Sequence, residues 1–125
     1  MIGKIHKAMV KYYNAKEHKM AFKYRPVLII GKADSNDYIV LPISSVSIAS
    51  NINKHYDIRI NNKQYVSLNL LKDNSYIRTN KQTTLNYKEI LEEISNLKQC
   101  YPELFRLIMN RVAEFQQYIQ EQAFE

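Results

Sequence analysis

Residues 24–45 read YRPVLIIGKADSNDYIVLPISS, and this stretch decides the fold. Residues 27–30 and 38–41 are apolar runs with β-branched and aromatic side chains, as in buried strands. Residues 32–37 between them are a cluster of turn formers. The stretch therefore predicts a hairpin with polar ends. Arg25 precedes Pro26 at the start of the first strand, and Ser44 and Ser45 close the second.

The rest of the first 85 residues also predicts short strands. We expect a strand over 4–11, followed by a basic and aromatic mobile loop over 12–23, in which residues 15–22 could instead form a short helix. We expect further strands over 24–31 and 37–46, with Gly31 ending the first of these or marking a bulge. Pro42 within the later strand indicates an edge or a bulge. After a loop over 47–54, residues 55–60 alternate cleanly and predict a hairpin with 64–70 through Asn61 and Asn62. Short strands over 75–79 and 83–85 complete a β-rich α+β fold with a small antiparallel barrel.

The pattern changes at Asn86. Asn86 with Glu89 resembles a capping box, and the apolar residues that follow predict a helix to about Lys98. Pro102 fits the first turn of a second helix, which has a long apolar face. We therefore predict one domain over 1–125, with the barrel over 1–85 and a two-helix extension over 86–125.

Charge divides the chain in the same place. The net charge is +6, but residues 1–85 hold a balance of +9 and residues 86–125 a balance of −3. Ten tyrosines accompany the lysines, and this combination suits stacking on unpaired bases beside phosphate contacts. A solvated lysine surface is the simpler reading of the charge alone. The basic front makes nucleic acid a candidate partner.

Several classes of site are excluded or unsupported. With two glycines, the chain has no glycine-rich phosphate loop. The histidines and the lone Cys100 show no metal-ligand spacing, so no metal or cofactor is expected. No apolar run approaches the length of a membrane span, and the N-terminus lacks the apolar segment of a secretory signal, so we expect a cytoplasmic protein without a membrane partner.

Arg25, Ser44 or Ser45, and Arg78 remain, each at a predicted strand end. Arginine binds phosphate bidentately, and two arginines with a hydroxyl could stabilise a phosphorane-like transition state. Such a site suits RNA cleavage by the substrate's own 2′-OH, which needs no metal. The residues do not identify a general base, because a guanidinium is a poor base at its ordinary pKa.

Three blocks of the chain resemble the MazF/PemK toxins of bacterial toxin–antitoxin systems. Residues 25–30 (RPVLII) resemble the family's RPVLVI strand, residues 39–45 (IVLPISS) its PIT/S strand, and residues 76–79 (YIRT) its QIRT/S strand. The resemblance implies an SH3-like barrel with helical additions. It also implies a metal-independent endoribonuclease that cleaves single-stranded RNA, forms a homodimer and is bound by a cognate antitoxin.

The resemblance also implies residue roles. Arg25 takes the place of the active-site arginine and Ser44 that of the catalytic threonine or serine. Arg78 is assigned to RNA or phosphate contact, and we expect RNA contacts from Ser45, Thr79, Lys16, Lys19 and Lys23.

The chain departs from the family pattern in three places. Lys4 follows Gly3 where an acid is usual, the loop AKEHKMAFK lacks glycine, and Tyr76 replaces a common glutamine. A longer tail also leaves the usual dimer in question. Two alternatives stay open on the same barrel: a non-catalytic module that binds nucleic acid or protein, and a toxin that targets gyrase.

Overall fold

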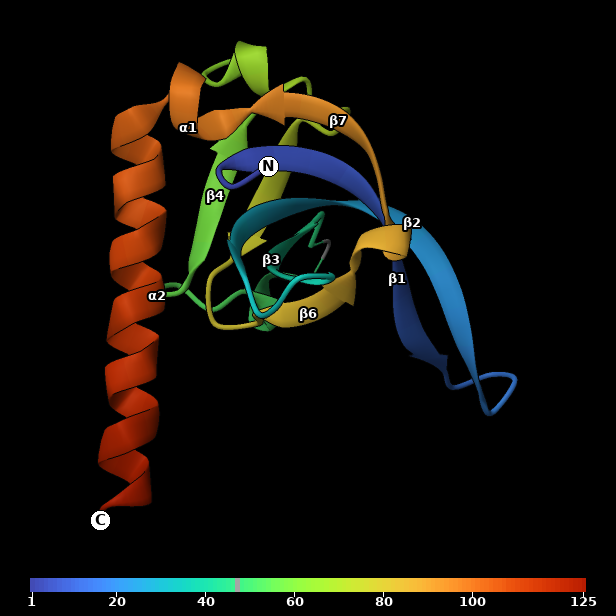
Figure 1. The fold of residues 1–125 in the computed structure, drawn as a ribbon, viewed down its shortest axis with the longest axis vertical. Coiled ribbons are helices and arrows are strands. Elements are labelled where there is room, and N and C mark those ends of the chain that lie inside the picture. The colour runs from blue at the N-terminus through green and yellow to red at the C-terminus, as the bar shows by residue number, and fades with distance from the viewer. Residues whose placement is uncertain (47) are drawn as a thin grey trace.

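Antiparallel strands curl into a half-barrel, and a long helix stands along one side of it (Figure 1). The structure is a computed structural model, and it describes residues 1–46 and 48–125. Its strands are β1 (Lys4–Asn14), β2 (Lys19–Lys32), β3 (Asp37–Ser44), β4 (Asp57–Asn61), β5 (Asn74–Arg78), β6 (Thr83–Asn86) and β7 (Ile90–Asn96). Two C-terminal helices follow, α1 (Leu97–Cys100) and α2 (Pro102–Ala123). The predicted fold class, a β-rich barrel with two C-terminal helices, is confirmed.

The strands pair in the order β4-β5-β3-β2-β1-β7, and β6 pairs with β3 outside this path. β3 changes partner along its length, because residues 37–40 pair with β6 while Ile43 and Ser44 pair with β5. Pro42, which has no N–H to donate, lies between these two pairings. The predicted bulge near Gly31 is present, because Ile29 pairs with Val40 and Gly31 with Ile39, so Ile30 is the extra residue.

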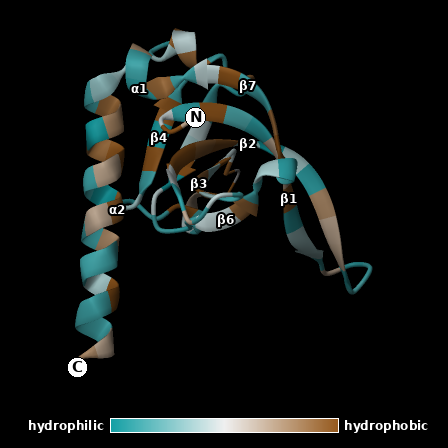
Figure 2. Ribbon diagram, viewed as in Figure 1, coloured by the Kyte–Doolittle hydropathy of each residue, from teal (hydrophilic) through white to brown (hydrophobic). Residues whose placement is uncertain are grey.

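The sheet buries apolar side chains on both faces. Ile5, Leu28 and Leu41 belong to one core, which α2 covers with Leu104 and Ile108. The opposite face carries a smaller core of Ala8, Val27, Ile29, Val40 and Leu85. Figure 2 shows the apolar residues concentrated on these strands, whereas hydrophilic residues dominate the C-terminal half of α2. No helix in the described ranges is long and apolar enough to cross a membrane.

The helix predicted from Asn86 to Lys98 is wrong. The capping box forms, but it caps a single 3₁₀ turn, η3 (Tyr87–Glu89), and the chain then continues as β7. β7 pairs with the edge of β1, which would otherwise leave its backbone groups unpaired. Two register shifts along this pairing let Ile90 pack on the smaller core and Ile94 on the larger one. Tertiary pairing therefore overrides the helical spacing of the isoleucines.

The loop predicted over residues 12–23 is also wrong. β1 and β2 stay paired from Ile5 and Leu28 out to Asn14 and Lys19, and so form a two-stranded arm that projects from the barrel (Figure 1). The Asn14 side chain accepts hydrogen bonds from the backbone N–H groups of Lys16 and Glu17, at 3.1 and 3.2 Å. His18 then adopts a φ of 54°, so the turn closes without glycine.

The strand predicted over residues 64–70 is absent. This segment holds a 3₁₀ turn, η2 (Val66–Leu68), and Leu68 is fully buried in the larger core. β4 pairs instead with β5, with Asn61 opposite Asn74. The Asn61 side chain accepts hydrogen bonds from the N–H groups of Lys63 and Gln64, so it starts a turn rather than a tight hairpin. In the predicted loop over 47–54, η1 (Ala49–Asn51) is a 3₁₀ turn, and Ser47 lies outside the described residues.

Candidate functional site

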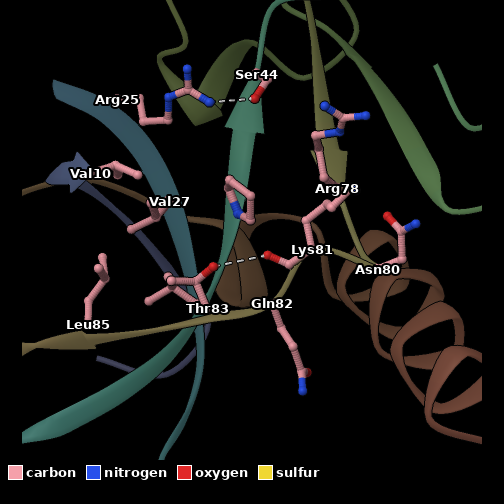
Figure 3. A pocket seen from close by; sticks show the side chains of 12 residues that line it. Val10, Arg25, Val27, Ser44, Arg78, Asn80, Lys81, Gln82, Thr83 and Leu85 are labelled. Carbon is pink, nitrogen blue, oxygen red and sulfur yellow. Dashed lines mark hydrogen bonds between the residues drawn. The ribbon is translucent and has the colours of Figure 1, made fainter. Parts of the chain in front are cut away.

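Arg25 and Ser44 meet where β2 and β3 separate. The last pair between these strands is Val27 with Pro42, and continuing that register by two residues places Arg25 opposite Ser44. Arg25 Nη1 donates a hydrogen bond to Ser44 Oγ at 2.9 Å (Figure 3). Side chains alternate along a strand, so both residues share a face with Val27 and Pro42. The two residues expected to form the site are therefore brought together.

Arg78 lies beyond Ser44, at the end of β5 (Figure 3). Its Nε and Nη2 atoms donate to the two carboxylate oxygens of Asp57, each at 3.2 Å, and Nη2 also donates to the carbonyl of Asn51 at 2.9 Å. The Asp57 side chain is 0% exposed, whereas that of Arg78 is 22% exposed. The buried carboxylate fixes the guanidinium in place, and Arg78 also lines a hollow beside Ser44.

A first hollow of about 440 Å³ opens between Arg25 and Arg78. Its floor is the surface of the smaller core, and its rim is polar and basic. The residues that line it are Val10, Arg25, Val27, Val40, Pro42, Ser44, Arg78, Asn80, Lys81, Gln82, Thr83 and Leu85. This lining contains three cations and no carboxylate, so it suits an anion that carries an apolar or flat group.

A second hollow of about 670 Å³ lies on the other side of the Arg25–Ser44 pair and shares both residues with the first. It lies between the base of the arm, β7 and the chain after η2. The residues that line it are Lys7, Lys23, Tyr24, Arg25, Pro26, Ile43, Ser44, Ser45, Asn69, Leu70, Leu71, Lys72, Ser75, Glu92 and Ile94. Glu92 is the only acidic residue in this lining, and its carboxylate lies 3.8 Å from Lys7 Nζ.

Burial, together with neighbouring positive charge, lowers the pKa values of two basic groups at this point. Burial lowers the pKa of Arg25, and the positive charge of Arg78 lowers it further. Burial and then the charge of Arg25 lower the pKa of Lys23. Each lowered pKa means that the protonated, positively charged form is less stable here than in water. An anion bound at this point would offset that cost. Within the described residues, Arg25 has no carboxylate partner.

The remaining residues expected to contact RNA are placed unequally. Ser45 and Lys23 line the second hollow. Lys16 is exposed in the turn of the arm, and Lys19 Nζ lies 3.2 Å from the Glu17 carboxylate there. Thr79 is 1% exposed, and its hydroxyl donates to the carbonyl of Tyr56 at 2.6 Å. The side chain of Thr79 therefore stabilises the end of β5 and lines neither hollow.

Sequence reasoning missed four basic or aromatic residues that line the two hollows: Lys7, Tyr24, Lys72 and Lys81. Lys81 follows the third motif by two residues, so its position was a usable signal. Lys7 and Lys72 come from distant segments and could not be placed without the pairing of β1 with β2. No histidine lines either hollow, and the described part of the chain holds no group of three or more His, Cys, Asp or Glu that could bind a metal.

Comparisons with known proteins agree with this architecture. Residues 3–115 match the family model described as the PemK-like, MazF-like toxin of type II toxin–antitoxin systems. Among solved structures, the chain is similar to the Mycobacterium tuberculosis toxin MazF-mt6, with a TM-score of 0.54 and 19% sequence identity. That match covers 86% of this chain and 94% of the other, and it shows a shared fold. No curated protein matches the chain.

Proposed function

The chain belongs to the PemK-like, MazF-like toxins of type II toxin–antitoxin systems, and from this premise we propose that it is an endoribonuclease that cleaves single-stranded RNA. Membership of the family implies an antitoxin partner. The observation that carries the RNA proposal is the Arg25–Ser44 hydrogen bond at the rim of a hollow with three cations and no carboxylate. A phosphodiester is the anion that such a rim would bind, and single-stranded RNA also supplies flat apolar groups for the floor.

The proposed reaction uses the substrate's own 2′-OH. Its oxygen attacks the adjacent phosphorus while the bond from phosphorus to the 5′ oxygen of the next nucleotide breaks. The 2′-OH loses its proton and the departing 5′ oxygen gains one, which gives a 2′,3′-cyclic phosphate and a free 5′-OH. Arg25 would stabilise the negative charge that develops on the phosphoryl oxygens, and Ser44 would orient Arg25 and the phosphate.

The other cations support binding rather than bond breaking. Arg78 would add positive charge to the phosphate pocket from a position fixed by Asp57. Lys23 in the second hollow and Lys16 and Lys19 on the arm would attract neighbouring phosphates, and such contacts weaken as salt rises. Burial and the charge of Arg78 lower the pKa of Arg25, so a phosphate bound beside its guanidinium would relieve an unfavourable charge.

The test is cleavage of an end-labelled pool of single-stranded RNA in a chelating buffer. We expect the wild type to cleave it and to leave 2′,3′-cyclic phosphate ends. Removing one transition-state contact of this kind costs about 100- to 1,000-fold in rate, so Arg25→Ala should lose at least about 100-fold.

The matched control is Arg59→Ala. Arg59 is an exposed arginine of β4 that donates to the Asn74 side chain and lines neither hollow. Its removal should leave cleavage within about twofold of wild type, because surface substitutions of this kind have small effects. Equal cleavage by wild type and Arg25→Ala would disprove the site assignment. If the wild type cleaves no single-stranded RNA, the enzymatic proposal is wrong, and a binding module or a gyrase-targeting toxin becomes the better reading.

We also propose that the chain forms a homodimer through α2. Phe115, Tyr118 and Ile119 are spaced i, i+3 and i+4 near the end of this helix and so share one face, on which Tyr118 and Ile119 are 46% and 41% exposed. Neighbouring exposed apolar side chains on one helix face are typical of a surface that a partner covers. Sedimentation equilibrium should give twice the chain mass for the wild type and the monomer mass for Ile119→Glu.

A further inference from the structure

The second hollow is lined by both basic and apolar side chains, and most of them have no role in the proposed reaction. Lys7, Lys23 and Lys72 line it beside Arg25, and Glu92 is the only acidic residue in its lining. Leu71 is 97% exposed and Tyr24 is 62% exposed, so two large apolar side chains face solvent next to these cations. A ligand for this hollow needs negative charge and a flat or apolar part.

The free edge of β2 explains how the hollow is built. β2 pairs with β3 only from Val27 inward, so its edge is open from Lys19 to Pro26. Tyr24 and Arg25 point to opposite faces of the strand, yet both line the second hollow, because the hollow wraps around this open edge. A chain that crosses the edge would therefore meet Arg25 and Tyr24 in succession.

The Arg25–Ser44 pair stands between the two hollows and lines both of them. A phosphate bound to this pair would have one nucleoside directed toward each hollow. The first hollow offers an aliphatic floor, whereas the second offers an exposed tyrosine ring. Lys7 Nζ lies 5.1 Å from the centroid of that ring. Because this ammonium group lies over one face of the ring, a base that stacks on that face would displace it toward the ring edge, where it could meet the neighbouring phosphate.

We propose that Tyr24 is the stacking platform for a nucleobase adjacent to the scissile phosphate, with Lys7, Lys23 and Lys72 binding the neighbouring phosphate. This inference rests on the proposed RNA substrate, and it names the contact that this RNA makes beyond the scissile phosphate. Stacking on an aromatic ring accepts any base, since every base has a flat face. Tyr24 therefore contributes affinity rather than sequence preference.

The arm extends this surface away from the site. Tyr24 and Phe22 lie two residues apart on one face of β2, which separates them by about 6.7 Å along the strand. Phe22 is 55% exposed, and Lys11 Nζ lies 6.0 Å from the centroid of its ring. The pairing of a lysine with an exposed ring is therefore repeated one step further out. Phe22 would stack the next base along the RNA.

The experiment measures binding of a short RNA by fluorescence anisotropy, with a 2′-deoxy nucleotide at the mapped cleavage point so that no cleavage occurs. Tyr24→Leu should weaken binding about 5- to 100-fold, because one stacked base contributes that much. Tyr24→Phe keeps the ring and should bind within about twofold of wild type. Tyr87→Leu is the matched control, because Tyr87 is 51% exposed and lines neither hollow.

An abasic scan of the same RNA separates stacking from a general loss of affinity. Removing the base at one position next to the cleavage point should weaken wild-type binding by the same factor as Tyr24→Leu. On that abasic RNA, Tyr24→Leu should have no further effect. Equal losses from Tyr24→Leu on intact and abasic RNA would overturn the stacking assignment, as would an equal loss from Tyr87→Leu.

The outcomes also separate this inference from the proposed function. If cleavage depends on Arg25 but RNA binding does not depend on Tyr24, the proposed endoribonuclease activity is supported and the stacking assignment is overturned. Base-dependent binding through Tyr24 without cleavage of any RNA would support the stacking platform and overturn the enzymatic proposal. In that case no cleavage point can be mapped, so the 2′-deoxy substitution and the abasic position are moved along the RNA in turn. Binding of an acidic peptide at Tyr24 with no affinity for RNA would overturn both.

Discussion

Arg25 Nη1 donates a hydrogen bond to Ser44 Oγ at 2.9 Å, at the point where β2 and β3 separate. The register of the two strands places these residues opposite each other, so the bond is a cross-strand contact. Both residues line both hollows. The pair therefore lies at the junction of every surface that we propose for RNA.

The first prediction concerns the coupling within this pair. Ser44→Ala and Arg25→Ala should each reduce the cleavage rate about 100-fold or more, and the double variant should be no worse than Arg25→Ala alone. The reason is that Ser44 acts largely by orienting Arg25. Ser44→Thr keeps the hydroxyl and should retain cleavage within about tenfold. Single-turnover rates with excess enzyme measure this, and losses that multiply in the double variant would show independent roles.

The second prediction concerns the stability cost of Arg25. Its lowered pKa means that the folded state binds the guanidinium proton less tightly than the unfolded chain does. The positive charge therefore costs stability at every pH below the lowered pKa, and this cost fades as pH rises through that value. Arg25→Gln should abolish cleavage and leave the melting temperature unchanged or raised by up to about 4 °C.

Arg106→Gln is the control for this effect. Arg106 is exposed on α2 and bonds to Glu103, so its charge is favourably placed. Its removal should leave the melting temperature unchanged or slightly lowered, since exposed pairs contribute about 1 kcal/mol or less. Scanning calorimetry at neutral pH compares the variants. A drop of more than about 4 °C for Arg25→Gln would show that the bond to Ser44 outweighs the cost of the charge.

The third prediction concerns the support behind Arg78. Asp57 is fully buried and accepts hydrogen bonds from Arg78 and from the backbone N–H of Asn53. Asp57→Asn keeps the shape but removes the charge, so it should reduce the free energy of unfolding by about 3 kcal/mol. Asp73→Asn, at an exposed position without a side-chain bond in the described residues, should change it by less than about 0.5 kcal/mol. Urea denaturation followed by circular dichroism measures both, and equal effects would contradict the assignment.

The hairpin of β2 and β3 and the contact between Arg25 and Ser44 were predictable, because both depend on residues close together in the sequence. Apolar runs on each side of a turn cluster identified β2 and β3, and Gly31 marked a bulge that the register confirms. The motif order predicted that Arg25 and Ser44 lie close together, and the strand register, continued beyond Val27 and Pro42, gives the physical reason why they meet.

The errors arose where a distant segment decides the local structure. The spacing of Ile90 and Ile94 fits a helix, but the open edge of β1 provides hydrogen bonds that make this segment β7. The arm lacks glycine, and its turn depends on the Asn14 side chain and on the positive φ of His18. The position of Tyr24 beside the second hollow could not be predicted from the sequence, because this hollow forms around an open strand edge.

The last prediction concerns Gly3, which joins three elements. Its N–H donates to the carbonyl of Ile29 at 2.7 Å, and its carbonyl accepts from the N–H of Lys98 at 3.0 Å. Its φ is +90°, and an added Cβ would lie 2.4 Å from Lys98 Cβ. Gly3→Ala should therefore reduce the free energy of unfolding by about 2–3 kcal/mol, through backbone strain and overpacking.

Gly31→Ala is the matched control, because a Cβ at Gly31 would meet no atom within 4 Å. This variant should change the free energy of unfolding by less than about 0.5 kcal/mol. Guanidinium denaturation of the two variants measures the difference directly, and equal stabilities would show that the contact between the N-terminus and α1 yields easily. Because Gly3 lines neither hollow, Gly3→Ala should cleave RNA at the wild-type rate under conditions where it is fully folded. A lower rate in the folded variant would mean that the start of β1 positions Arg25 through its pairing with β2.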